Sequence, residues 1–97
     1  MINDLKIARQ KLELKSRLEV TSQIQSRIDE YSSLEDEYSK FSCKMAKTIL
    51  ENFEYIKTED SLLSFIQNTI DLSLSQDDPE KISIISQIGS SLLLIKI

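Results

Sequence analysis

The sequence predicts an all-α protein: a long N-terminal amphipathic or coiled-coil helix, or a helical hairpin, followed by two shorter helices. Two observations point to this fold class. The chain of 97 residues contains one glycine and one proline, so it lacks the residues that tight turns and many short strands need. Apolar residues also recur at steps of three and four. The length allows a single helical domain over residues 1–97.

The first predicted element covers residues 3–57, which contain neither glycine nor proline. The apolar pattern in this segment changes phase near Ile28–Tyr31 and again near Met45–Ile49. Such shifts are compatible with a bent helix or with a helical hairpin, and both remain open from the sequence. A hairpin would turn at Tyr31-Ser32-Ser33 or at Lys40–Cys43, where small polar residues cluster.

An apolar seam along this element supplies the candidate partner-binding residues. Its members follow the a and d positions of a heptad and then continue at helical spacing. Each large side chain that becomes buried would contribute roughly 1.5–3 kcal/mol before ordering costs. Two apolar residues near the chain end join the set. The candidates are Tyr31, Leu34, Tyr38, Phe41, Met45, Ile49, Phe53, Ile56, Leu92 and Ile95.

Two shorter helices are predicted over residues 59–75 and 79–97. Thr58 is typical of an N-cap residue, and Asp78-Pro79 is a strong helix start with proline at the first position. The last segment is apolar on more than one face, so we expect a buried helix that is interrupted or bent at Gly89. Its apolar end is expected to be buried, either in the chain's own core or in a groove of a partner.

Missing residue types exclude several kinds of chemistry. The chain has no histidine, one cysteine and one glycine, which excludes histidine-based catalysis, disulfide frameworks and glycine-rich phosphate loops. The acidic clusters Glu35-Asp36-Glu37 and Asp77-Asp78 are interpreted as a solvated helix face and a helix cap. We therefore expect no enzyme activity, no cofactor and no metal site.

The charge distribution bears on partners and location. The net charge of −4 disfavours direct nucleic-acid binding, since nucleic-acid binders carry a basic excess. Residues 1–28 sum to +3 and residues 29–80 sum to −9. No apolar run is long enough for a membrane span, and the first residues lack the apolar region of a secretory signal. An intracellular protein, cytoplasmic or nuclear, is expected.

Several short stretches resemble one known family. They are Arg9-Gln10-Lys11, Leu18–Ser22, Met45-Ala46 and Glu51–Ile56. In order and spacing they are similar to the small Dad-type coiled-coil subunits of the DASH complex, the outer-kinetochore ring that couples kinetochores to microtubules. The resemblance covers roughly residues 7–66. It implies a scaffold subunit inside a helical hetero-oligomer, in the nucleus at the spindle.

The sequence thus predicts a non-enzymatic helical protein that binds protein partners, or a second copy of itself, through its amphipathic seam. A second hypothesis is a small acidic helical inhibitor of the viral or plasmid anti-defence type. Such an inhibitor would act as a homo-oligomer, or would block a basic groove with its acidic stretch.

Overall fold

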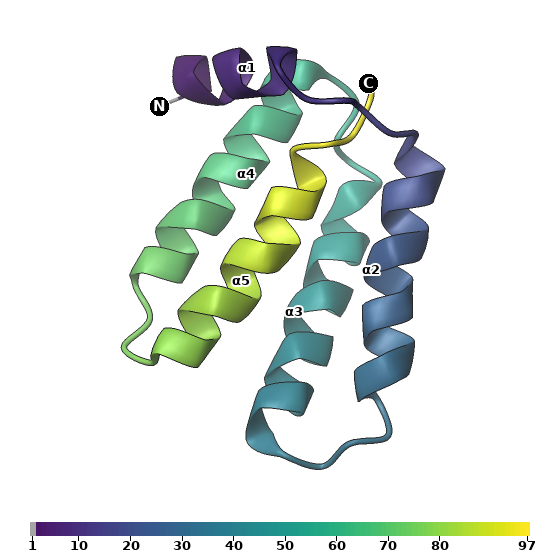
Figure 1. Ribbon diagram of the computed structural model, residues 1–97, viewed down its shortest axis with the longest axis vertical. Coiled ribbons are helices and arrows are strands. Elements are labelled where there is room, and N and C mark those ends of the chain that lie inside the picture. The colour runs from purple at the N-terminus through teal and green to yellow at the C-terminus, as the bar shows by residue number, and fades with distance from the viewer. Residues whose placement is uncertain (1) are drawn as a thin grey trace.

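The computed structural model describes residues 2–97, which form an all-α bundle (Figure 1). No strand occurs in this range, and the backbone forms one isolated bridge between Lys15 and Ile95. None of the helices in the described range is long and apolar enough to cross a membrane. The helices are α1 (Ile2–Gln10), α2 (Arg17–Tyr31), α3 (Glu37–Phe53), α4 (Glu59–Leu74) and α5 (Pro79–Leu92).

Side-chain caps determine where the helices begin. The Ser16 side chain accepts a hydrogen bond from the backbone N–H of Glu19 at the start of α2, and Asp36 caps α3 in the same way. Thr58 forms a reciprocal capping box with Ser61 at the start of α4. Asp78 caps α5, whose first residue is proline. The predicted starts at residues 59 and 79 are therefore confirmed.

The prediction of one long helix over residues 3–57 is wrong. The helical backbone is broken over residues 11–16 and again over residues 32–36, so this segment forms three helices. The turn that the hairpin alternative placed at Tyr31-Ser32-Ser33 is confirmed, because α2 ends at Tyr31, but a two-helix hairpin over residues 3–57 does not include the separate helix α1. The other predicted turn, Lys40–Cys43, lies inside α3. None of the described residues has a positive φ angle, so serine and aspartate caps make these turns without glycine.

Helix α5 occupies the centre of the bundle (Figure 1). It packs against α4, α3 and α2, while α2 and α3 also pack against each other. Helix α1 crosses the beginning of α4. Helices α3 and α4 are not packed against each other, so α5 is left partly uncovered between them.

The core sits around this central helix. Leu62, Leu63, Ile85, Leu92 and Ile95 are fully buried. The rest of the core is contributed by every helix from α2 to α5 together with the segment that follows α3. Its further apolar members are Val20, Ile24, Ile28, Cys43, Ala46, Ile49, Phe53, Ile56, Ile66 and Ile88.

The last element also differs from the prediction. Helix α5 ends at Leu92 instead of continuing to residue 97. Gly89 lies within α5 without interrupting it, and a Cβ atom at this position would approach the Thr69 Cγ2 atom to 3.2 Å. The glycine therefore allows α4 and α5 to pack closely.

Arginines and a short backbone pairing close the end of the bundle where α1, the segment after α3 and the chain end meet. The buried Arg9 donates a 2.7 Å hydrogen bond to the Leu93 carbonyl, which satisfies a carbonyl at the end of α5. Arg17 donates to the carbonyls of Phe53 and Ile56. The Lys15 N–H donates to the Leu94 carbonyl at 2.7 Å, and the Lys96 N–H donates to the Lys15 carbonyl at 2.7 Å.

Truncating a core residue of α5 should lower stability far more than truncating an exposed leucine. Leu92→Ala leaves a cavity at a fully buried position and is expected to cost about 2–5 kcal/mol. Leu18 is 77% exposed, so Leu18→Ala should change the free energy of unfolding by less than about 0.5 kcal/mol. Urea denaturation followed by circular dichroism measures both, and equal effects would contradict this core.

Candidate protein-binding site

The predicted partner-binding residues divide into two groups in the structure. Ile49, Phe53, Ile56, Leu92 and Ile95 are at most 4% exposed and belong to the chain's own core. In this fold they stabilise the bundle and offer no surface to a partner. Of the apolar chain end, Leu92 and Ile95 are buried in the chain's own core, whereas Ile97 is 49% exposed.

The second group is partly or fully exposed and consists of Tyr31, Leu34, Tyr38, Phe41 and Met45. Tyr38 in this group forms a hydrogen bond within the chain. Its hydroxyl donates a 2.8 Å hydrogen bond to Asp78 Oδ2, and thereby links α3 to the cap of α5. This bond is the main cause that raises the pKa of Tyr38 to about 12, because ionising the phenol would place two negative charges together. The same bond, followed by the Glu80 N–H, lowers the pKa of the Asp78 carboxyl.

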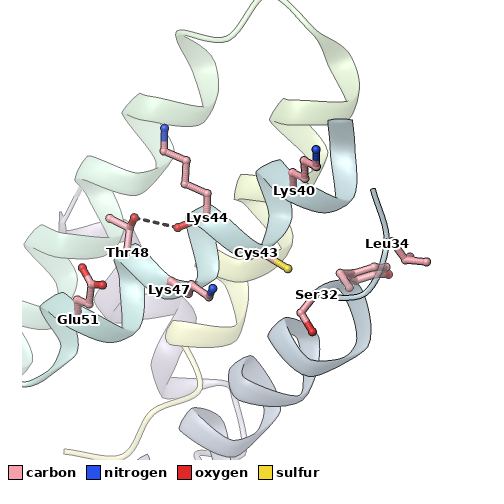
Figure 2. Close-up of a pocket in the computed structure, with 9 residues that line it drawn as sticks. Ser32, Leu34, Lys40, Cys43, Lys44, Lys47, Thr48 and Glu51 are labelled. Carbon is pink, nitrogen blue, oxygen red and sulfur yellow. Dashed lines mark hydrogen bonds between the residues drawn. The ribbon is translucent and has the colours of Figure 1, made fainter. Parts of the chain in front are cut away.

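Tyr31 and Leu34 line a hollow of about 450 Å³ beside Cys43 (Figure 2). Leu34 is 46% exposed, whereas Cys43 is buried. The Cys43 thiol points toward α2 and donates to the Ile28 carbonyl at 3.6 Å. The thiol is thus packed between the two helices and forms part of the hollow's inner wall.

A row of lysines runs along the outer side of α3 next to this hollow. Lys40, Lys44 and Lys47 all line it, together with Thr48 and Glu51. The Thr48 hydroxyl donates a 2.8 Å hydrogen bond to the backbone carbonyl of Lys44, and not to the side chain of any of the three lysines. In the part of the chain that the structure describes, none of these three lysines forms an ion pair.

Phe41 and Met45 lie on the other side of this row, in a second hollow of about 420 Å³. We call this hollow the α3–α4 groove. Leu72 of α4 completes its apolar surface, and the fully buried Ile85 of α5 lies beneath it, where α3 and α4 stand apart. Its polar lining residues are Glu37, Lys40, Lys44, Gln76 and Lys81.

Lys81 holds one end of the α3–α4 groove in place. Its Nζ atom lies 3.6 Å from Glu37 Oε1 and 5.2 Å from the centre of the Phe41 ring. Such contacts are individually weak at a surface, but together they fix the Phe41 ring beside a positive charge. With Lys40 and Lys44 also lining the groove, its edge is positive although the chain as a whole is negative.

The sequence identified part of this groove and missed the rest. Phe41 and Met45 were found through the heptad spacing. Leu72, Lys81 and Ile85 come from other helices, and the charge sum over residues 29–80 concealed the lysines of α3 among more numerous acids. The signal that could have found them is the spacing of Lys40, Lys44 and Lys47, which places all three along one side of a helix.

Among the described residues, no group of three cysteine, aspartate or glutamate side chains is placed to hold a metal ion. No protein-family model, no curated protein and no solved structure matches the chain. The resemblance to the Dad-type subunits therefore stays a prediction from the sequence.

Tyr38→Phe should make stability less dependent on pH. The lowered Asp78 pKa adds stability above its ordinary value of 3.8, and this stability is lost as pH falls through the lowered pKa. The raised Tyr38 pKa adds stability below its ordinary value of 10.0, which is lost as pH rises toward about 12. The variant should therefore be less stable than the parent at pH 7, with a gap that narrows below about pH 4 and above pH 10.

Urea denaturation at pH 3, 7 and 10.5 measures this gap. Tyr55→Phe is the matched control, because the Tyr55 side chain is 78% exposed; its gap should stay near zero throughout. A Tyr38→Phe gap that does not change with pH would contradict the assigned bond.

Proposed function

We propose that the chain is a non-enzymatic helical interaction protein, and that its α3–α4 groove binds an acidic amphipathic helix of a partner protein. One observation supports this proposal above the others. The apolar surface of Phe41, Met45 and Leu72 is edged by three lysines. Lys40 and Lys44 form no ion pair with described residues, and Lys81 forms one, with the exposed Glu37.

The shape of the groove favours a helix as the ligand. Helices α3 and α4 flank it and α5 lies at its base, so a further helix could lie lengthwise between α3 and α4. Binding would place apolar residues at i, i+3 or i+4, and i+7 onto Phe41, Met45 and Leu72. Phe41 offers a large contact surface, and the flexible Met45 side chain adapts to different apolar residues.

The charge of the groove favours an acidic ligand. Lys40, Lys44 and Lys81 would face the polar edges of a bound helix. Carboxylates placed there gain short-range attraction, while the net charge of −4 repels acidic partners at long range. Selectivity would therefore depend on contact at the groove. The wider role of a scaffold subunit rests on the resemblance to the Dad-type subunits alone.

Binding of a designed peptide tests this function. The probe is a fluorescein-labelled helical peptide of eighteen residues, with leucines on one face and glutamates elsewhere, followed by fluorescence anisotropy. Lys44→Glu should weaken binding about tenfold, equivalent to about 1.4 kcal/mol, because it places a like charge against the peptide. Met45→Ser should weaken binding comparably by removing apolar contact.

Lys57→Glu is the matched control, since Lys57 is exposed and does not line the groove. It should change affinity less than twofold. The same peptide with lysines in place of glutamates tests the second hypothesis, in which an acidic surface blocks a basic groove. Tighter binding of the lysine peptide, or equal effects of Lys44→Glu and Lys57→Glu, would overturn the proposed function.

A further inference from the structure

A polar hollow of about 260 Å³ lies where α2, α3 and α5 meet. We call it the Arg27 hollow. Its walls include Arg27 and Tyr31 of α2, Ser42 of α3, and Ser83 and Ile84 of α5. Among the described residues, it shares no lining member with the α3–α4 groove. A ligand bound in this hollow would therefore leave the groove free for the helix proposed above.

Neutral groups hold the Arg27 side chain in place. Its Nη1 donates to Ser42 Oγ at 3.2 Å and its Nη2 donates to Gln87 Oε1 at 2.9 Å. The guanidinium carbon also lies 5.8 Å from the centre of the Tyr31 ring. No carboxylate in the described part of the chain forms an ion pair with Arg27, although Glu80 lines the same hollow. The guanidinium is thus oriented by contacts that supply no negative charge.

The hollow also presents hydrogen-bond donors that lack an acceptor among the described residues. Arg27 uses two of its five N–H groups in the bonds to Ser42 and Gln87. Ser42 is 3% exposed, and its hydroxyl accepts from Arg27 but donates to none of the described residues. The Ser83 hydroxyl likewise accepts, from Gln87 Nε2 at 3.4 Å, and donates to none of them. Because buried polar groups in proteins are normally paired, these donors favour a ligand that supplies oxygen lone pairs.

We propose that the Arg27 hollow binds a small monocarboxylate with a planar apolar body, for which benzoate is a model. A carboxylate matches the guanidinium in both shape and charge, and the serine hydroxyls would donate to its remaining lone pairs. The half-buried Tyr31 and Ile84 offer apolar contact to the body of the ligand. Glu80 adds a negative charge to the lining, which disfavours a more highly charged anion such as inorganic phosphate.

Titration of the isotope-labelled full chain with sodium benzoate, followed by NMR at constant ionic strength, tests this site. The backbone amide signals of Arg27, Ser42 and Ser83 should shift to saturation, with a dissociation constant on the order of 1 mM. Two further probes identify the chemistry. Benzamide has the shape of benzoate without its charge, and inorganic phosphate has charge without the apolar body. Both should bind at least about tenfold more weakly than benzoate.

Matched variants locate the binding in the hollow. Ser42→Ala removes one donor and should weaken benzoate binding about tenfold. Ser73→Ala is its control, because Ser73 is also 3% exposed but donates to the Ile70 carbonyl, away from the hollow; this change should leave the affinity unaltered. Arg27→Gln should abolish saturable binding. Arg17→Gln removes an equal charge from a half-buried arginine that is also bonded across helices, and should preserve binding.

Circular dichroism establishes which variants are folded. The proposal is overturned if benzoate causes no saturable shift in the parent chain, or if benzamide or phosphate binds as tightly as benzoate. A folded Ser42→Ala or Arg27→Gln variant that binds benzoate like the parent would also overturn it. So would equal losses in Ser42→Ala and Ser73→Ala, since these would assign the effect to lowered stability and not to the hollow.

Discussion

The burial of α5 is the constraint on which the rest of the structure depends. This helix is apolar on more than one face, and a helix of that kind is stable in water only when other elements surround it. Helices α2, α3 and α4 cover it on three sides, and the Gly89 contact with Thr69 brings α4 close. None of the other described helices packs against it. The α3–α4 groove lies above α5, between the two helices that do not touch each other.

Local signals in the sequence predict much of the fold. Thr58 and Asp78-Pro79 predict helix starts, because a cap acts only on the backbone groups next to it. Helices α4 and α5 begin at these positions. The break over residues 11–16 contains no glycine or proline, and its one local signal is Ser16, the N-cap of α2, three residues before Glu19. The path of the chain through the break depends on bonds from Arg9 to the Leu93 carbonyl and from Lys15 to the Leu94 carbonyl. Bonds between residues so far apart in the sequence do not show in the spacing of apolar residues.

The candidate site shows the same division between local and distant information. Helical spacing correctly grouped Phe41 and Met45 with Ile49 and Phe53, but spacing alone does not reveal whether an apolar face meets its own chain or another. The structure separates them: the first half of the seam borders the surface and the second half lies in the core. The charge sum over residues 29–80 also failed to reveal the positive edge of the groove. A sum along the chain does not show that the lysines of α3 share one side of the helix while many acids lie elsewhere.

The bonds that join the two ends of the chain have a consequence for the order of folding. Helix pairs α2–α3 and α4–α5 are neighbours in sequence, so each can associate after closing a short loop. The Arg9 bond to Leu93 spans 84 residues and requires a far larger loss of chain entropy, which grows with loop length. We expect the two hairpins to form first and the closure of α1 onto the chain end to come last. By the same reasoning, that closure would be the first to open transiently in the native protein.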